Sequence, residues 1–311
     1  MQFRQEKGFG LVSEILSILS EIPLGKYKIQ IALILRQAML INGILYSTEA
    51  WSDFQDADIK LLEQVDEYLL RSIFKAHRKT PLEFLYLETG TTPIRYILAS
   101  RRLNYLHNIL HRNEKELIYR VFQTQKQTPS KGDFVSLIMK DCEILDIEFD
   151  ENFIKSTSKL KFKKIVKEKV QRAALKQLNN LKSGHSKVRS IRYSKLASQG
   201  YINSELFSNE EIDTLFALRS KIIRVKNNFY NGNSNTLCSY GCIQVESSEH
   251  LMECKYLTDK MNDSSVLAEA SYSDIYGSIE EQKQIAVIYT ELNKIRENLA
   301  TQSISVNQLN Q

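Results

Sequence analysis

A short stretch near the C-terminal end constrains the fold more than any other part of the chain. It holds three of the four cysteines, in the order Cys238, Cys242, His250 and Cys254, with the spacing C-x3-C-x7-H-x3-C. Zinc prefers four such ligands in a tetrahedron, and a Cys3His set leaves no position open for water. The first pair can lie on a tight turn around Gly241, and one helical turn brings His250 and Cys254 onto the same face. The sequence therefore predicts a structural zinc site.

Other interpretations of these residues remain open. The first two cysteines could be small core residues, Cys242 and Cys254 could form a disulfide, and His250 could be a surface histidine. A disulfide requires an oxidising compartment, and the N-terminal segment lacks the layout of a signal peptide. The longest apolar run, 29–46, is interrupted by polar residues, which favours a buried helix over a membrane span. We expect reduced thiols, a nuclear or cytoplasmic protein that is not secreted, and no membrane association.

Composition and periodicity favour a mainly α fold. The 311 residues include only four prolines and eleven glycines, and apolar residues recur at helical spacing in several segments. We expect a helical bundle over 1–78, a helical basic linker region over 79–230 and a small zinc module over 231–260. A last helix and a disordered Ser/Asn/Gln-rich tail from Thr301 are expected within 261–311. Cys142 follows apolar residues at four-residue steps, so we expect it in the core.

Charge is distributed unevenly along the chain. The net charge is +5, but the window 155–195 contains fourteen Lys and Arg and a single acid, Glu168, which gives this window +13. Within it, 160–181 is predicted to be a long helix with one apolar stripe, formed by Phe162, Val166, Val170, Ala173, Leu178 and Leu181. Lysines cover much of the remaining surface, and such lysines neutralise phosphates without distinguishing bases.

This window predicts a surface for RNA or DNA. The basic residues expected to contact phosphates are Lys161, Lys163, Lys164, Lys167, Arg172, Lys176, Lys187, Arg189 and Arg192. Nearby aromatic residues could stack on exposed bases, namely Phe162, Tyr193, Tyr201, Phe229 and Tyr230. The alternative is a solvated helix face that serves solubility.

Other candidate sites are weaker. His107 and His111 lie four residues apart, but no cysteine or carboxylate is placed to complete a metal site, so we expect surface histidines. Arg101 and Arg102 could contact phosphate or form ion pairs. The sequence has no glycine-rich phosphate loop, no catalytic serine or zinc-protease motif, and no Asp-Asp pair. We expect neither catalytic residues nor a small-molecule substrate.

Ten short segments follow one another along the chain in a recognisable order: Leu40–Tyr46, Glu49–Trp51, Leu62–Asp66, Thr80-Pro81, Leu85–Gly90, Pro93–Arg95, Ser100–Leu103, Lys161–Lys164, Val166–Lys169 and His185–Val188. In this order they resemble the region after the palm in the reverse transcriptases of non-LTR (LINE-type) retrotransposons. The Cys/His set is similar to the CCHC zinc knuckle of that family. Here three residues separate the first two cysteines, where close relatives often have two.

The resemblance implies a polymerase thumb over 11–74, which grips the primer-template duplex, followed by the linker and a knuckle that holds template RNA or target DNA. The catalytic Asp-Asp motif of the polymerase would lie upstream of Met1. The chain would then be a non-catalytic C-terminal fragment of an RNA-directed DNA polymerase polyprotein that binds RNA or DNA. A second hypothesis is a helical scaffold stapled by zinc, whose basic helix binds an acidic protein partner.

Overall fold

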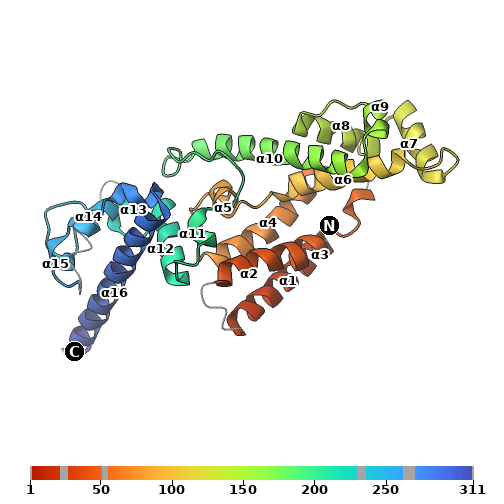
Figure 1. Cartoon of the computed structure of the whole chain (residues 1–311). Helices are drawn as coiled ribbons and strands as arrows, with labels where there is room; N and C mark the ends of the chain where they lie inside the picture. The colour runs from red at the N-terminus through yellow and green to blue at the C-terminus, as the bar shows by residue number, and fades with distance from the viewer. Residues whose placement is uncertain (1, 22–26, 51–54, 230–235, 262–269, 310–311) are drawn as a thin grey trace.

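The computed structural model describes residues 2–21, 27–50, 55–229, 236–261 and 270–309. Within these ranges the protein is mainly helical (Figure 1), and β-structure is limited to two isolated antiparallel bridges, Thr89–Ser198 and Leu237–Val245. The predicted mainly α class is confirmed. None of the helices in the described ranges has the length and apolar character needed to cross a membrane.

The N-terminal part forms a helical bundle. Its elements are α1 (Gln2–Glu21), α2 (Lys28–Leu35), the π-helix η2 (Arg36–Ile41), α3 (Asn42–Ile44), the 3-10 helix η3 (Thr48–Ala50) and α4 (Asp56–Ile73). Helix α1 packs on α4 at Gly8, where an added Cβ would lie 2.9 Å from a methyl carbon of Val65. The segment predicted as one buried helix, 29–46, is divided among α2, η2 and α3. It is buried on one side only, since Ile34 is 65% exposed. Trp51 lies outside the described residues.

The middle of the chain forms a second layer of helices. It contains α5 (Leu82–Thr89), α6 (Ile94–Leu110), α7 (Leu117–Gln127), α8 (Phe134–Leu145), α9 (Glu151–Ser156) and α10 (Lys159–Ser183). Figure 1 shows α10 along the top of the molecule, and it packs against α5, α6 and α8. Cys142 is buried, as predicted, and Arg102 forms a buried ion pair with Asp141 through two hydrogen bonds of 2.6 Å.

The buried stripe of α10 differs from the predicted one at two positions, because Ala174 is buried in place of Ala173 and Lys182 in place of Leu181. Its buried residues recur every four positions and are Phe162, Val166, Val170, Ala174, Leu178 and Lys182. Leu181 is 49% exposed instead. A strict four-residue step advances by about 40° around a helix of 3.6 residues per turn, so the buried side turns gradually along α10. This rotation buries a lysine where the sequence predicts a leucine.

The C-terminal part consists of short helices around one long helix. They are α11 (Gly200–Asn203), α12 (Asn209–Arg219), α13 (Lys226–Phe229), α14 (Ser248–Glu253), α15 (Lys255–Thr258), the 3-10 helix η5 (Tyr272–Tyr276) and α16 (Ile279–Leu309). The tail expected to be disordered from Thr301 is therefore helical as far as Leu309. Extending an existing helix adds one hydrogen bond per residue without the cost of nucleation, so polar residues can continue it.

The buried residues form two clusters. One holds the bundle of α1–α4 together and includes Ile94 and Leu98 of α6. The other runs from α5 to α16 and includes Cys238 and Cys254. The Cys/His stretch therefore shares a core with α12 and α16, and the division of the chain at 78, 230 and 260 stays a prediction.

Candidate metal centre and basic surface

The first two cysteines lie on a tight turn between two extended strands of chain. The bridge Leu237–Val245 and a 2.9 Å hydrogen bond from the Cys238 amide to the Gln244 carbonyl hold the two sides together. At the turn, Gly241 has φ +87°, a left-handed conformation that suits glycine. This geometry turns both cysteine side chains towards the same point.

The other two candidate ligands, His250 and Cys254, lie on the short helix α14 and directly after it. Ser247 caps α14, because its hydroxyl accepts a 3.1 Å hydrogen bond from the amide of His250. One turn later the helix ends at Cys254, which then begins α15. The predicted pairing of His250 with Cys254 across one helical turn is thus present.

The four side chains come close enough together to bind a metal ion. Their ligand atoms all lie within 4.8 Å of one another, and this is the one group of at least three His, Cys, Asp or Glu with that property in the described residues. The sulfur of Cys254 lies 3.8 Å from that of Cys238 and 3.6 Å from that of Cys242. Zn–S bonds of about 2.3 Å in a tetrahedron place sulfurs about 3.8 Å apart. A disulfide requires about 2.05 Å, so the Cys242–Cys254 disulfide considered above is absent and all cysteines are free.

The histidine supports the same assignment. His250 is buried, and neither ring nitrogen has a hydrogen-bond partner in the described residues. A buried polar atom without a partner costs about 1–3 kcal/mol, and coordination to a metal removes that cost for one nitrogen. Burial raises the pKa of the Cys254 thiol to about 12 in the metal-free chain. A bound cation reverses this effect, because thiolate rather than thiol is the ligand.

Side chains from the long C-terminal helix anchor this module. Glu246 accepts hydrogen bonds from the amide and the hydroxyl of Ser239, at 3.1 and 2.7 Å, and pairs with Arg296 of α16 at 3.2 Å. The hydroxyl of Tyr289 in α16 donates a 2.6 Å hydrogen bond to the carbonyl of Ser248. The stretch that carries the four candidate ligands is therefore held against α16, which lies outside the predicted zinc module.

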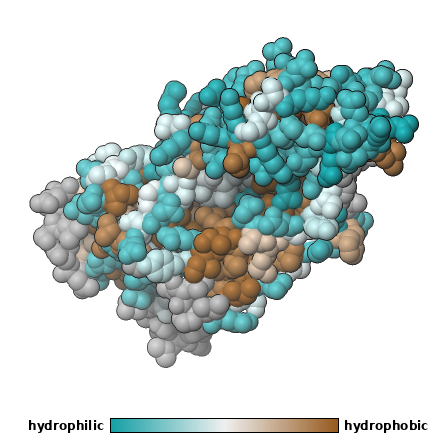
Figure 2. All heavy atoms as spheres, turned by 45° about the vertical axis from the view of Figure 1, so that its right-hand side comes forward, coloured by the Kyte–Doolittle hydropathy of each residue, from teal (hydrophilic) through white to brown (hydrophobic). Residues whose placement is uncertain are grey.

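Most of the predicted phosphate-contacting residues are exposed. Eight of the nine are exposed, and in the described part of the chain none of these eight has a carboxylate partner; they are Lys161, Lys163, Lys164, Lys167, Arg172, Lys176, Arg189 and Arg192. We call these eight residues the basic surface. Lys164, Arg172 and Lys176 share one ridge of α10 with the exposed acid Glu168, at steps of four residues, and Lys163 and Lys167 lie on the neighbouring ridge. Figure 2 shows hydrophilic side chains gathered over the upper part of the molecule, where α7 to α10 lie in Figure 1.

The ninth residue has a different role. The ammonium group of Lys187 donates hydrogen bonds to the carbonyls of Lys221 and Asn228, at 3.3 and 3.0 Å. Lys182 is 2% exposed and donates to the carbonyls of Val188 and Ile191. Burial lowers the pKa of Lys182, and the nearby charge of Arg192 lowers it further. These two lysines fix the loop after α10 in place.

The prediction of stacking aromatics is wrong for the residues that the structure describes. Phe162, Tyr193 and Tyr201 are 2%, 8% and 0% exposed, so no base can stack on them. The Phe229 side chain and Tyr230 lie outside the description. These aromatic residues were predicted to stack on bases because they lie near the basic helix in the sequence. Closeness in sequence does not show whether a side chain is buried or exposed.

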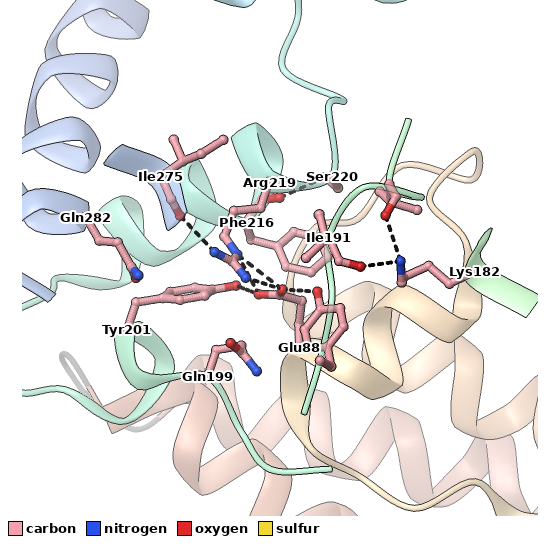
Figure 3. A network of polar contacts seen from close by, with 12 residues as sticks. Glu88, Lys182, Ile191, Gln199, Tyr201, Phe216, Arg219, Ser220, Ile275 and Gln282 are labelled. Carbon is pink, nitrogen blue, oxygen red and sulfur yellow. Dashed lines mark hydrogen bonds and ion pairs between the residues drawn. The ribbon is translucent and has the colours of Figure 1, made fainter. Parts of the chain in front are cut away.

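Tyr193 and Tyr201 belong to a buried network centred on Glu88 of α5 (Figure 3). Glu88 is 0% exposed and accepts hydrogen bonds from both tyrosine hydroxyls and from Arg219 of α12, whose Nη2 lies 2.9 Å from Oε1. Arg219 also donates to the carbonyl of Ile275, at 2.8 Å. Burial, and then the charge of Glu88, raise the pKa of both tyrosines. Burial lowers the pKa of Arg219, but the charge and hydrogen bonds of Glu88 together with Tyr201 and Tyr193 raise it above its ordinary value. The network joins α5, the loop at Tyr193, α11, α12 and η5.

A signal for this network is present in the sequence. Glu88 directly follows the apolar run Phe84–Leu87, and an acid beside such a run on a buried helix requires a buried partner.

The remaining candidates have structural roles. His107 is buried, contrary to the expected surface position, and its Nε2 lies 2.9 Å from the carbonyl of Thr157. His111 stacks on it, with ring centroids 4.1 Å apart. Arg102 pairs with Asp141, and Arg101 donates to the carbonyl of Leu45.

Comparisons of the chain with protein-family models, with curated proteins and with solved structures found no significant match. The resemblance to LINE-type reverse transcriptases therefore rests on the sequence motifs.

Proposed function

We propose that this chain binds RNA or DNA through the basic surface of α10 and the loop after it, and that Cys238, Cys242, His250 and Cys254 hold a structural zinc ion. The observation that carries the proposal is eight exposed basic side chains without a carboxylate partner in the described residues. Natural surfaces usually mix charges of both signs, so such a surface favours a polyanionic partner. Lysine and arginine at these positions would neutralise phosphates and release counterions.

The buried side of α10 supports a rigid binding surface. The apolar stripe of α10 packs against α5, α6 and α8. The helix is therefore held in place, and the distances between its exposed basic residues stay fixed. Phosphate contacts from a rigid helix position nucleic acid but carry no sequence information. We therefore propose binding that tolerates many sequences and involves no catalytic step.

The zinc ion would act on the fold. It would replace the missing partner of the His250 ring and hold the turn at Gly241 to α14. The free energy of metal binding then becomes folding free energy of this module. A Cys3His site of this kind requires reduced thiols, which agrees with a nuclear or cytoplasmic location.

The family assignment remains part of the proposal. The order of motifs supports a chain derived from the thumb, linker and knuckle of a LINE-type reverse transcriptase, in which the parent protein is an RNA-directed DNA polymerase. The helical bundle of α1–α4 followed by the basic helix and the Cys/His module agrees with that order.

The test is a double variant of the basic surface, Lys163→Ala/Lys167→Ala, measured by fluorescence anisotropy on a structured RNA over a salt series. Each lost phosphate contact should reduce the slope of log affinity against log salt by about one unit, and both together by about two. The matched control is Lys126→Ala/Lys294→Ala, which removes the same charge from lysines paired with Glu151 and Glu210. Equal slopes for the two variants would refute the assignment of this surface. If an acidic protein is the true partner, a pull-down from lysate would retain it after nuclease treatment.

A further inference from the structure

A polar pocket lies beside the Glu88 network. Its volume is about 400 Å³, and it is lined by Ser190, Ile191, Arg192 and Gln199 of the loop, Arg219 of α12, Tyr276 of η5 and Gln282 of α16. This volume falls within the range of small-molecule sites. The pocket therefore lies where three segments far apart in sequence meet.

The charge of the pocket comes from one residue. The guanidinium of Arg219 is neutralised by the buried carboxylate of Glu88, which leaves that pair without net charge. Arg192 is exposed and has no carboxylate partner in the described residues. The pocket therefore carries one uncompensated positive charge, which fits a single phosphate.

The hydrogen-bonding groups of the pocket include both donors and acceptors. Nε2 of Gln282 donates to the Gly277 carbonyl at 2.8 Å, and Nε2 of Gln199 to the Ala197 carbonyl at 3.4 Å. The first contact holds the Gln282 amide, while the second is long for a hydrogen bond. Both use only the amide nitrogens, so in the described residues the two amide oxygens accept no hydrogen bond. The hydrogen bonds of Arg219 use three of its five N–H groups. Acceptors and donors at fixed positions match the edge of a nucleobase.

The pocket also contains an aromatic ring, whereas the eight residues of the basic surface are all lysines and arginines. Tyr276 is 44% exposed, and the Arg219 guanidinium lies 5.0 Å from its ring centroid. Figure 3 shows Gln199 and Gln282 near the ring of Tyr201 and the Arg219 side chain, with the loop carrying Ile191 beside them. A flat ring with an accessible surface offers the stacking that single-stranded nucleic acids use.

The pocket is continuous with the basic surface. Arg192 belongs to both, and Arg189 lies three residues before it on the same loop. Lys182 fixes this loop through the carbonyls of Val188 and Ile191, so the two arginines are held next to the end of α10. A strand whose phosphates follow α10 would reach the pocket at Arg192.

We propose that this pocket takes up one unstacked nucleotide of a single-stranded segment in the bound RNA. Arg192 contacts its phosphate, the amide oxygens of Gln199 and Gln282 accept from its base, and Tyr276 offers a stacking face. This inference rests on the proposed function. It adds the recognition of one unstacked nucleotide to the phosphate contacts that the basic surface would make.

The experiment compares two RNA hairpins that are identical except for a single bulged nucleotide, 2-aminopurine. Anisotropy should show tighter binding of the bulged hairpin, and the 2-aminopurine fluorescence should fall when the base stacks. Gln199→Ala/Gln282→Ala should bind the bulged hairpin about tenfold more weakly, as expected for two lost hydrogen bonds, and the plain hairpin unchanged. The control, Gln125→Ala/Gln127→Ala on α7, removes two amides from an element outside the pocket and should leave both affinities unchanged.

The possible results separate the two proposals. Salt-dependent binding of both hairpins with equal affinity and constant 2-aminopurine fluorescence would overturn the pocket and leave the basic surface standing. No binding of either hairpin at low salt would overturn the proposed function and this inference with it. The fluorescence of the wild-type complex decides the question even if the glutamine variants fail to fold.

Discussion

Removing the carboxylate of Glu88 tests the reasoning about the buried network. In Glu88→Leu the Arg219 guanidinium stays buried without its counter-charge, which costs about 3–5 kcal/mol. Tyr193 and Tyr201 also lose their acceptor, at about 1–3 kcal/mol for each hydroxyl that stays dry. Because the pocket beside Arg219 admits water, we expect the lower part of this sum, a loss of about 5 kcal/mol. That is a large share of the 5–15 kcal/mol typical of native proteins.

The double variant Glu88→Leu/Arg219→Met separates the ion pair from simple packing. It removes both charges, so it should be more stable than Glu88→Leu alone, although each change by itself destabilises the chain. Urea unfolding followed by circular dichroism at 222 nm measures all three variants. The control is Lys294→Ala, which breaks an ion pair whose partners are 57% and 56% exposed and should cost less than about 1 kcal/mol. Simple addition of the two single losses would refute the account of a coupled buried pair.

Three further predictions concern the metal centre, a buried thiol and a close backbone contact. Native mass spectrometry should find one zinc ion per chain, and Cys254→Ser should weaken zinc binding by more than about a hundredfold; a wild-type chain that retains no zinc would contradict the assignment. Burial raises the pKa of the Cys142 thiol to about 11, so its thiolate is scarce at pH 8 and its alkylation should accelerate about tenfold per pH unit up to about pH 10. A rate that levels off near pH 8.5 would show an ordinary, accessible thiol. Gly90 has φ +66°, and an added Cβ would lie 2.1 Å from the amide nitrogen of Ser198, so Gly90→Ala should lower the unfolding free energy by at least about 3 kcal/mol. Gly10→Ala in α1, where nothing lies within 4 Å, should instead stabilise slightly, and equal effects of the two changes would refute the close contact.

Local features were predictable from the sequence. The spacing of Cys238, Cys242, His250 and Cys254 specifies a turn and one helical turn, and both are local geometry. The capping box at Ser208 and Glu211 likewise marks the start of α12, because its two hydrogen bonds span three residues. Such patterns depend on near neighbours alone, so a single sequence contains them in full.

Contacts across long separations were not predictable in the same way. Glu88 and Arg219 are 131 residues apart, and no local pattern pairs them. Lys182 was counted among the basic residues of the window 155–195, whereas the rotation of the stripe buries its ammonium group, which donates to the carbonyls of Val188 and Ile191. Tyr193 and Tyr201 looked like stacking residues because they are near the basic window, but their hydroxyls are taken by Glu88. In each case the side chain's role is determined by the group that it contacts in the folded chain, which its neighbours in the sequence do not reveal.

The most direct test of nucleic-acid binding is the affinity of the zinc-loaded chain for a structured RNA measured between 50 and 200 mM salt. If about six of the eight residues of the basic surface contact phosphates, affinity should fall about a thousandfold over this range. No binding at 50 mM salt, or an affinity that does not change with salt, would contradict the proposal that these side chains bind a phosphate backbone.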